Sequence, residues 1–262
     1  MIAASITLNR TPQVEYLLRI ADTALIHAQR LSEWCGHGPI LEEDIAMTNM
    51  ALDTIGQARA LLTRAGQLEG AGHDEDQLAF LREERDFRNA TIAELPLRRG
   101  GGDFADTMLR NFLLATWFKV LWQRLQASSD EEVAGIAAKA LKESRYHQQH
   151  AGDWVVRLGD GTEESALRMR AAVDRVWPYV AELFEADAVD EAATASSLGP
   201  RFSDLRDEWL ADVKAVFDEA ALALPPDSPL RSTGRRGVHS EHLGYMLAEM
   251  QHLQRAFPGG KW

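Results

Sequence analysis

The sequence holds one cysteine, Cys35, among its 262 residues. A single thiol forms no internal disulfide and no thiolate cluster around a metal, and sparse cysteine is typical of proteins in a reducing cytoplasm. Positive charge is also scarce, since 28 lysines and arginines and 40 acidic residues give a formal net charge of −12. Because an acidic surface repels polyanions, we expect neither a nucleic acid nor an anionic membrane as a partner.

Long apolar runs are missing as well. No stretch approaches 18 uninterrupted apolar residues, and the opening MIAASITLNRTPQ shows no basic segment followed by an apolar one. The sequence therefore predicts neither a membrane-spanning helix nor a secretory signal, and we expect a cytoplasmic protein. The period-two alternation of strands and repeats of fixed length are absent too, which excludes most β and solenoid architectures.

The sequence instead contains successive segments in which apolar residues recur at three- and four-residue steps, bounded by capping or helix-breaking residues. The predicted helices cover residues 12–34, 41–67, 78–93, 103–127, 129–159, 163–188, 202–224 and 240–257. Pro178 predicts a kink, and the small, polar residues 189–200 predict a loop. We expect an all-α helical bundle with additional C-terminal helices, forming one domain over residues 1–262.

Three of these helices differ in how their apolar residues are spread. The helix at 103–127 is apolar on nearly all sides, so we predict that it is the most enclosed one. Asp22 and Gln29 lie beside the apolar stripe of the helix at 12–34, which predicts positions on its surface flank. In the helix at 41–67, the first face consists of Ile45, Thr48, Leu52 and Ile55, and Asp53 lies on an adjoining face of small residues where another helix could come close.

One long helix carries an acid and a histidine toward the core. Ser129 opens it with capping-box spacing, and Gly159 predicts a left-handed end. Between them His147 lies inside the apolar stripe and Glu143 lies at its edge. An acid and a histidine one turn apart on a buried face are typical of metal sites in helical bundles, and equally of a core histidine satisfied by a neighbouring carboxylate.

Helical bundles that bind two irons follow a ligand template in which two helices supply one carboxylate each and two others supply Glu-x-x-His. A spacing of three places both partners on one face, a turn apart. Here Asp53 is followed by Gly56 at the histidine position, and Glu143 is followed by Tyr146. Residues 107–129, in the helix that should supply a lone carboxylate, contain no acid.

The literal Glu-x-x-His of the sequence lies in the last helix, at Glu249 and His252. His252 points away from the apolar stripe of that helix, which includes Leu243 and Met250, so we predict that it is on the surface. The sequence thus predicts a bundle with the shape of a di-iron protein and an incomplete ligand set.

Two loops contain residues that bind anions in other proteins. Residues 98–102 read Arg-Arg-Gly-Gly-Gly ahead of a helix, where backbone amides can hold a phosphate, but the spacing matches no nucleotide-binding fingerprint. A flexible connector is the other interpretation. Arg231, Arg235 and Arg236 form the one locally basic spot, which suits a phosphate-bearing ligand or an acidic partner surface, or else a solvated loop.

Three segments and the closing Trp262 have a more specific likeness. The segments are EEDIAMTNMALDTIGQARALL, LKESRYHQQHAGDWVVRLGDGT and SEHLGYMLAEMQHLQRAFPG. Through them the chain resembles, over nearly its whole length, the PaaC subunits of bacterial phenylacetyl-CoA epoxidase (ring 1,2-monooxygenase) complexes.

The resemblance implies a ferritin-like fold and a place in phenylacetate catabolism, as the non-catalytic structural subunit of a hetero-oligomeric monooxygenase complex. Its partners would be the homologous PaaA subunit, which holds the di-iron centre and the CoA thioester, and the other subunits. No cofactor is then expected on this chain. The resemblance makes Asp53, Glu143 and His147 residual positions of an abandoned metal site, although these three still offer ligands if the helices bring them together.

Two other functions stay open at this point. The chain is an oxygenase subunit in its own right if a two-metal site is built from unorthodox ligands, which the metal content of the purified protein would reveal. Alternatively, it is a stand-alone helical scaffold unrelated to phenylacetate, which the proteins that co-purify with it would reveal.

Overall fold

The computed structural model describes residues 3–96 and 103–260, so the glycine run at 100–102 lies outside the described residues. In these ranges the regular elements are helices, besides an isolated bridge between Thr233 and Val238. The α-helices are α1 (Pro12–Ser32), α2 (Leu41–Glu69), α3 (Glu75–Phe80), α4 (Thr91–Glu94), α5 (Phe104–Leu125), α6 (Glu131–Gly159), α7 (Glu163–Val176), α8 (Ala188–Ala195), α9 (Arg206–Glu219), α10 (Glu241–Met250) and α11 (His252–Ala256). Short 3-10 helices are η1 (Glu84–Asp86), η2 (Trp177–Phe184), η3 (Phe202–Leu205) and η4 (Gly234–Arg236). The predicted all-α class is confirmed.

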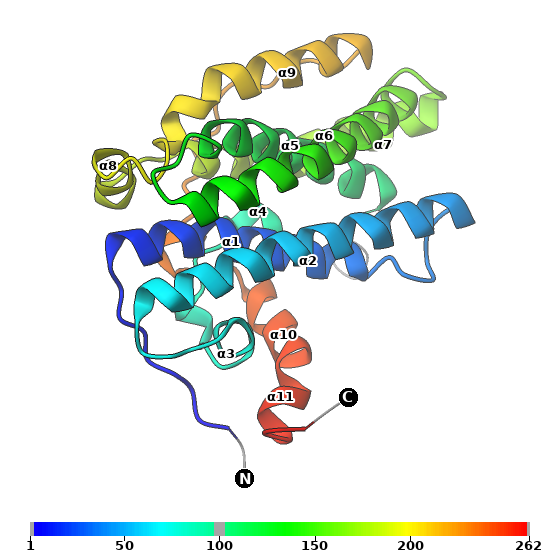
Figure 1. Cartoon of the computed structure of the whole chain (residues 1–262). Helices are drawn as coiled ribbons and strands as arrows, with labels where there is room; N and C mark the ends of the chain where they lie inside the picture. Colours follow the sequence, from blue (N-terminus) through cyan, green and yellow to red (C-terminus); the bar gives the residue numbers. More distant parts are fainter. Residues whose placement is uncertain (1–2, 97–102, 261–262) are drawn as a thin grey trace.

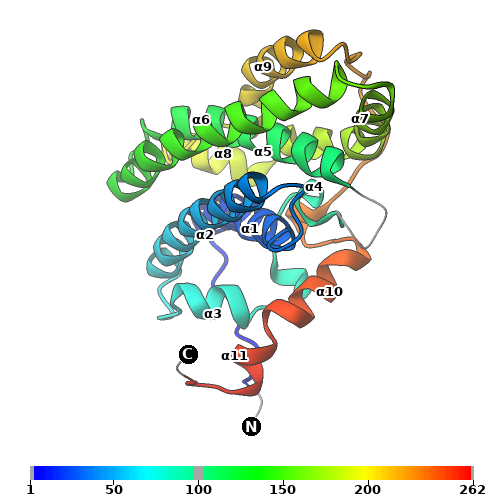
Figure 2. The same ribbon diagram turned by 90° about the vertical axis from the view of Figure 1, so that its right-hand side faces the viewer.

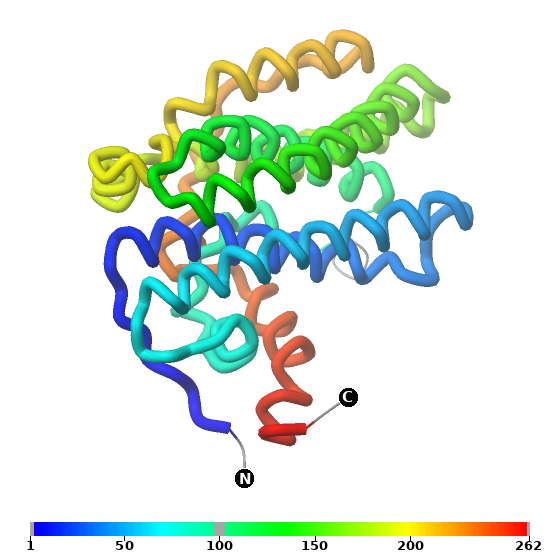
Figure 3. Tube along the Cα trace, viewed as in Figure 1, coloured from blue at the N-terminus to red at the C-terminus, as the bar shows by residue number. Residues whose placement is uncertain are grey.

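Two helical hairpins, α1–α2 and α5–α6, stack to form the bundle, and α2 and α6 lie side by side at its front in Figure 1. Helix α9 packs on the outer side of α5 and α6, and α7 packs against the same pair. Helices α3, α10 and α11 lie on the opposite side, beyond α1 and α2 (Figure 2). The first and last described segments of the chain lie together there (Figure 3), where the backbone N–H of Ala3 donates to the carbonyl of Arg255 at 2.9 Å.

Helices α1 and α5 are the enclosed helices of the bundle. Every residue of α5 from Ala105 to Phe118 is buried, which confirms the prediction from its apolar sequence. Every residue of α1 from Tyr16 to Ala28 is buried as well, although its sequence shows only one apolar stripe. The difference arises because α2, α4 and α8 all pack against α1, and because its buried polar residues have partners elsewhere in the chain, such as Arg82 for Asp22 and Asn111 for His27.

Both ends of α6 differ from the prediction. The N-cap is Asp130, whose carboxylate accepts from the backbone N–H groups of Glu132 and Val133, each at 3.1 Å. The hydroxyl of Ser129 instead donates to the carbonyl of Ser196 at 2.9 Å. Gly159 is the last helical residue and is not left-handed; it is needed because a Cβ there would collide with the backbone of Ala220.

The predicted helix at 78–93 is wrong, since α3 ends at Phe80 and α4 begins at Thr91. Side chains of α1 explain the break: the Asp22 carboxylate accepts from the backbone N–H of Arg88 at 2.8 Å, and the Thr23 hydroxyl accepts from that of Ala90 at 3.0 Å. Backbone amides that bond to another helix are not available to an α-helix of their own.

Three further boundaries are corrected. Residues 189–200 are not a loop throughout, because α8 begins after Asp187, whose side chain forms a capping box with Asp190. Pro178 does not kink a continuous helix but lies at the start of η2, where α7 has already ended. The last predicted helix is divided at Gln251 into α10 and α11.

None of the described helices is both long and apolar enough to cross a membrane.

The first face of α2, with Ile45, Thr48, Leu52 and Ile55, points outward. Ile45 is 52% exposed and Leu52 is 61% exposed, while Thr48 and Ile55 are only partly covered. The buried face consists instead of Met47, Met50, Ala51, Thr54, Gln57, Ala58, Leu61, Leu62 and Ala65. The helix is therefore apolar on two sides, and the bundle covers the side with methionine and alanine.

Asp22 is fully buried, so the prediction of a surface position is wrong; Gln29 is half-buried. The Asp22 carboxylate accepts hydrogen bonds from both terminal nitrogens of Arg82, and the bond from Nη1 is 2.9 Å long. Arg82 is also fully buried, and its guanidinium lies 4.2 Å from the centroid of the Phe87 ring. Its partner comes from 60 residues away, which the apolar spacing along α1 cannot reveal.

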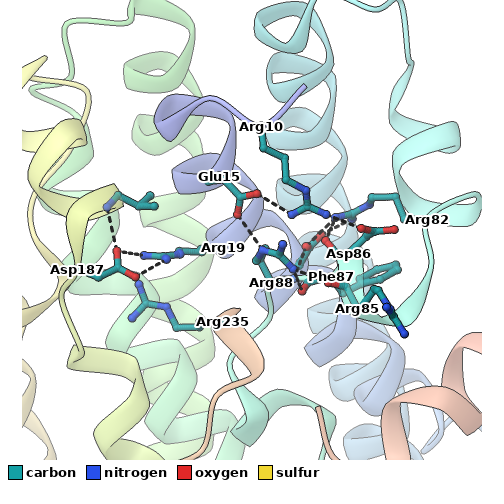
Figure 4. Close-up of polar contacts among 12 residues, drawn as sticks. Arg10, Glu15, Arg19, Arg82, Arg85, Asp86, Phe87, Arg88, Asp187 and Arg235 are labelled. Carbon is teal, nitrogen blue, oxygen red and sulfur yellow. Dashed lines mark hydrogen bonds and ion pairs between the residues drawn. The ribbon is translucent and has the colours of Figure 1, made fainter. Parts of the chain in front are cut away.

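Ion pairs also tie α1 to segments on both sides of it (Figure 4). Arg19 Nη2 lies 2.7 Å from the Asp187 carboxylate, next to α8. Glu15 pairs with Arg10 at 2.6 Å and with Arg88 at 2.8 Å. These contacts join the first helix to the loop before α4 and to the segment before α8.

Of the three arginines in the predicted basic spot, two are on the surface and one is in the interior. Arg231 and Arg236 are exposed, but Arg235 is buried, and burial, with Arg19 nearby, lowers its pKa to about 10. The Arg235 Nη1 donates to the carbonyls of Glu182 at 3.0 Å and Glu185 at 2.9 Å. Arg235 thus fastens its own loop to the bundle and is not available to a phosphate or an acidic partner.

Candidate functional site

The structure joins two of the three residues that the sequence singled out. His147 Nε2 lies 3.1 Å from Asp53 Oδ2, across the boundary between α6 and α2. Burial lowers the pKa of His147, and Asp53 offsets this effect only in part, so the imidazole is neutral near pH 7. Glu143, one turn away, instead accepts a hydrogen bond from Gln57 Nε2 at 2.9 Å.

The inward-facing pairs on α2 and α6 are shifted from those expected. The expected pairs began at Asp53 and Glu143, but their second members are exposed. Buried residues are found instead at Met50 on α2, three positions before the half-exposed Asp53, and at Ser144 and His147 on α6. Met50 and Ser144 are buried at the positions where the template places glutamates.

Helices α1 and α5 contribute His27 and Asn111 to the same interior. His27 Nε2 lies 3.1 Å from Asn111 Oδ1, and Asn111 Nδ2 donates to the sulfur of Met50 at 3.3 Å. His27 therefore carries its proton on Nε2, while Nδ1 has no hydrogen-bond partner in the described part of the chain. Burial, followed by the charge of Arg110, lowers the pKa of His27 to about 3. The imidazole is neutral.

The sequence interpretation did not single out His27 or Asn111. A signal was present, because each is a lone uncharged or weakly basic polar residue within an otherwise apolar stretch of a helix, as in NFLLATWF for Asn111. Such residues need a hydrogen-bond partner when the helix is buried. Which residue supplies the partner depends on the packing of α1 against α5, which the sequence does not show.

The inner positions do not fit a two-iron centre. A ferritin-like site uses four carboxylates and two histidines, all projecting inward. The corresponding residues here are His27, Met50, Asp53, Asn111, Ser144 and His147, which include one carboxylate, and the side chain of that residue, Asp53, is 42% exposed. Throughout residues 3–96 and 103–260, no three His, Cys, Asp or Glu residues lie close enough to hold a metal ion. The polar groups of this interior bond mainly to one another.

Stability should fall more steeply on acidification for the parent protein than for a His27→Gln variant. The folded-state pKa of His27 is about 3, whereas an unfolded chain titrates near 6.5. Between these values the unfolded state binds a proton that the folded state does not. Unfolding free energy therefore decreases by about 1.4 kcal/mol per pH unit for this group as pH falls below 6.5, and its contribution is complete above that pH.

Urea unfolding of both proteins between pH 7 and pH 4.5 measures this effect. The slope of unfolding free energy against pH should be smaller for His27→Gln by nearly the contribution of one proton, about 1.4 kcal/mol per pH unit. His252→Gln, at an exposed position on α11, is the control and should keep the parent's slope. Equal slopes for the parent and His27→Gln would show that His27 is not held neutral in the folded state.

Replacing Glu143 with alanine should lower the unfolding free energy by about 1–3 kcal/mol, because it leaves the buried amide of Gln57 without its acceptor. Lys142→Ala, one residue earlier and exposed, should change the unfolding free energy by less than about 0.5 kcal/mol. Thermal and urea unfolding of the two variants provide the comparison. If both variants melted like the parent, Glu143 would have no part in a stabilising network.

The fold and the inner positions together define a class of protein: a ferritin-like helical bundle without the ligand set of the two-iron members. The chain belongs to the phenylacetic acid catabolic protein family of PaaA and PaaC, whose family model matches residues 2–262. It is 46% identical over 247 residues to the C subunit of 1,2-phenylacetyl-CoA epoxidase from Escherichia coli strain K12, a match that covers 94% of this chain and 98% of that protein. The resemblance seen in the three segments is confirmed.

Proposed function

We propose that this chain is the structural, non-catalytic subunit of a phenylacetyl-CoA epoxidase complex, and that it supports a PaaA-like di-iron subunit. The observation that carries the proposal is the 46% identity to the C subunit of an epoxidase over 94% of this chain and 98% of the relative. Relatives that align over nearly their whole lengths share their helices in the same order, so a shared place in the complex is the simplest interpretation. The cytoplasm suits a chain whose only thiol, Cys35, is exposed.

The chemistry of the interior supports the non-catalytic role. Oxygen activation at two irons depends on carboxylates that bridge and charge-balance the metals. Here Met50, Asn111 and Ser144 occupy inner positions with a thioether, an amide and a hydroxyl, and neutral His27 takes the place of a carboxylate. The remaining acid, Asp53, is bonded to His147.

Co-expression with the catalytic subunit tests the proposal. We expect that subunit to be soluble and to elute with this chain when both are made, and to be largely insoluble when made alone, because a partner that binds only the folded form stabilises it. Iron analysis of the separated proteins should find the metal with the catalytic subunit. A catalytic subunit that is equally soluble and active alone would overturn the structural role.

The same samples test the alternative of an oxygenase with unorthodox ligands. Two tightly bound irons per molecule of this chain, purified by itself, would assign the di-metal site to it. Such a result would also contradict the geometry above, since the six corresponding positions include one carboxylate, the half-exposed Asp53.

A further inference from the structure

The segment from His239 to Phe257, which we call the C-terminal arm, contains α10 and α11 and lies on the side of the bundle beyond α1 and α2 (Figure 2). Its helices bury few side chains: Leu243, Met246 and Leu247 of α10, and none of α11. Regions with few buried apolar contacts open locally more easily than the rest of a fold. A polar contact at the start of the arm can therefore decide whether the arm stays attached.

Such a contact is made by His239, whose side chain has no exposed surface. Its Nδ1 lies 2.9 Å from Oε2 of Glu94, the last residue of α4, and its Nε2 lies 3.1 Å from the backbone carbonyl of Phe87. The Glu94 side chain is equally enclosed. Both ring nitrogens thus meet oxygens of the bundle, away from solvent.

The two contacts require two protons on the ring. A neutral imidazole has one N–H donor and one acceptor nitrogen, whereas an imidazolium has two donors. The carbonyl of Phe87 can only accept, and it also receives Nη1 of Arg88 at 2.8 Å, so Nε2 of His239 is a donor. An ionised Glu94 can only accept as well. The contact at Nδ1 is therefore a hydrogen bond only when a second proton lies between His239 and Glu94.

This second proton belongs to the ring, because an imidazole is a stronger base than a carboxylate. Oε1 of Glu94 accepts the backbone N–H of Ser240, the N-cap residue of α10, at 2.6 Å, and Oε2 accepts Nδ2 of Asn89 at 2.9 Å. A buried ion pair is stable when additional hydrogen bonds of this kind satisfy its remaining polar groups. One carboxylate thus joins the charged ring of His239 to the first turn of α10.

Within residues 3–96 and 103–260, no other cation pairs with the Glu94 carboxylate. The charged and titratable groups around the contact come from the elements packed there: Asp22 and Arg30 of α1, Arg82, Glu84 and Arg88 of the segment before α4, Glu182 of η2, and Glu241 and His242 of the arm. Each of the three arginines is paired with a different carboxylate. Loss of the Nδ1 proton would leave Glu94 without an opposite charge and bring two acceptor atoms together in the interior, which is unfavourable.

We propose that the contact between His239 and Glu94 is a pH-sensitive switch for the C-terminal arm. The arm is attached while His239 holds both ring protons, and it detaches as pH rises and Nδ1 loses its proton to solvent. In the detached arm the ring is a free imidazole, which loses a proton at about pH 6.5. Detachment therefore releases a proton above that pH, and its equilibrium constant should rise by up to about tenfold per pH unit. The switch is a property of this chain and does not depend on the proposed function.

Amide hydrogen exchange measures detachment of the arm. Exchange rates in α10 are compared at pH 6.5, 7.5 and 8.5, each divided by the rate of an unfolded peptide at the same pH. In the parent, we expect the protection of α10 to fall by about tenfold or more over this range, while the protection of α5 changes little. His239→Gln removes the titrating ring, so its α10 should show weaker protection that does not change with pH. His252→Gln, at an exposed position on α11, is the matched control and should follow the parent.

Two exchange results would overturn the switch: equal protection of α10 at all three pH values in the parent, or a pH-dependent fall that persists in His239→Gln. Nitrogen-15 NMR of the ring provides a second measurement, which needs only the parent protein. At pH 7.5, where a free imidazole is mostly neutral, both ring nitrogens of His239 should carry protons. A ring with a single proton at that pH, in a protein whose α10 is protected, would also overturn the inference.

Discussion

Replacing Asp22 with alanine should lower the unfolding free energy by about 3–5 kcal/mol, a large part of the total stability of a domain. Asp22 and Arg82 are both fully buried, and the carboxylate also accepts the backbone N–H of Arg88 at 2.8 Å. Without the carboxylate, the Arg82 guanidinium stays in the interior with carbonyl acceptors but no opposite charge. An uncompensated buried charge is the source of the loss.

A double variant tests this explanation. Asp22→Ala with Arg82→Met removes both charges and keeps much of the arginine's volume, so it should recover a large part of the stability lost in Asp22→Ala. Arg59→Ala, at an exposed pair with Glu75, is the control and should change unfolding free energy by at most about 1 kcal/mol. Urea unfolding measures all three variants. A double variant no more stable than Asp22→Ala would mean that lost packing or lost backbone bonds, and not the unpaired charge, cause the effect.

Replacing Glu94 with alanine should lower the unfolding free energy by a similar amount, about 3–5 kcal/mol. We expect the C-terminal helices to be loosened most. Glu94 is fully buried at the end of α4 and accepts from Asn89 Nδ2 at 2.9 Å, His239 Nδ1 at 2.9 Å and the backbone N–H of Ser240 at 2.6 Å. Three donors thus meet on one carboxylate, one from nearby Asn89 and two from the distant segment at His239 and Ser240. Its removal leaves them without their acceptor and loosens the start of α10.

Limited proteolysis distinguishes a local effect from a global one. Glu94→Ala should be cut within residues 241–256 at protease concentrations that leave the parent intact, while the bundle resists longer. Glu249→Ala, at an exposed position on α10, is the control and should be cut like the parent. Uniform cleavage along the whole chain of Glu94→Ala would show that the carboxylate holds the entire fold and not this attachment alone.

The sequence predicted the number and placement of the long helices because their apolar residues follow the helical period. It was less successful where two faces compete, as in α2. The spacing indicates a first face that includes Ile45 and Leu52, but the bundle covers Met47, Met50 and Ala51. Periodicity shows that a face is apolar, and it does not show whether the cover is this chain or another one.

Polar residues in the interior were the hardest to place. The apolar spacing places Asp22 beside the stripe of its helix, and the run of arginines predicts a basic loop, yet Asp22 and Arg235 are both buried and each has partners more than 40 residues away. In the candidate site, the contact between Asp53 and His147 was within reach because helical spacing put His147 on the inward stripe of α6. His27 and Asn111 were not, since their pairing depends on the contact between two separate helices.

The enclosure of α1 also bears on how the chain is made. Translation adds roughly 5–20 residues per second, so Arg19 emerges on the order of ten to thirty seconds before Asp187, which lies 168 residues later. Through that interval the nascent helix has its arginine and much of its apolar surface without the contacts of α8. Fragments that end before α8 leave this side of α1 bare, and they should be poor substitutes for the full chain in any reconstitution of the complex.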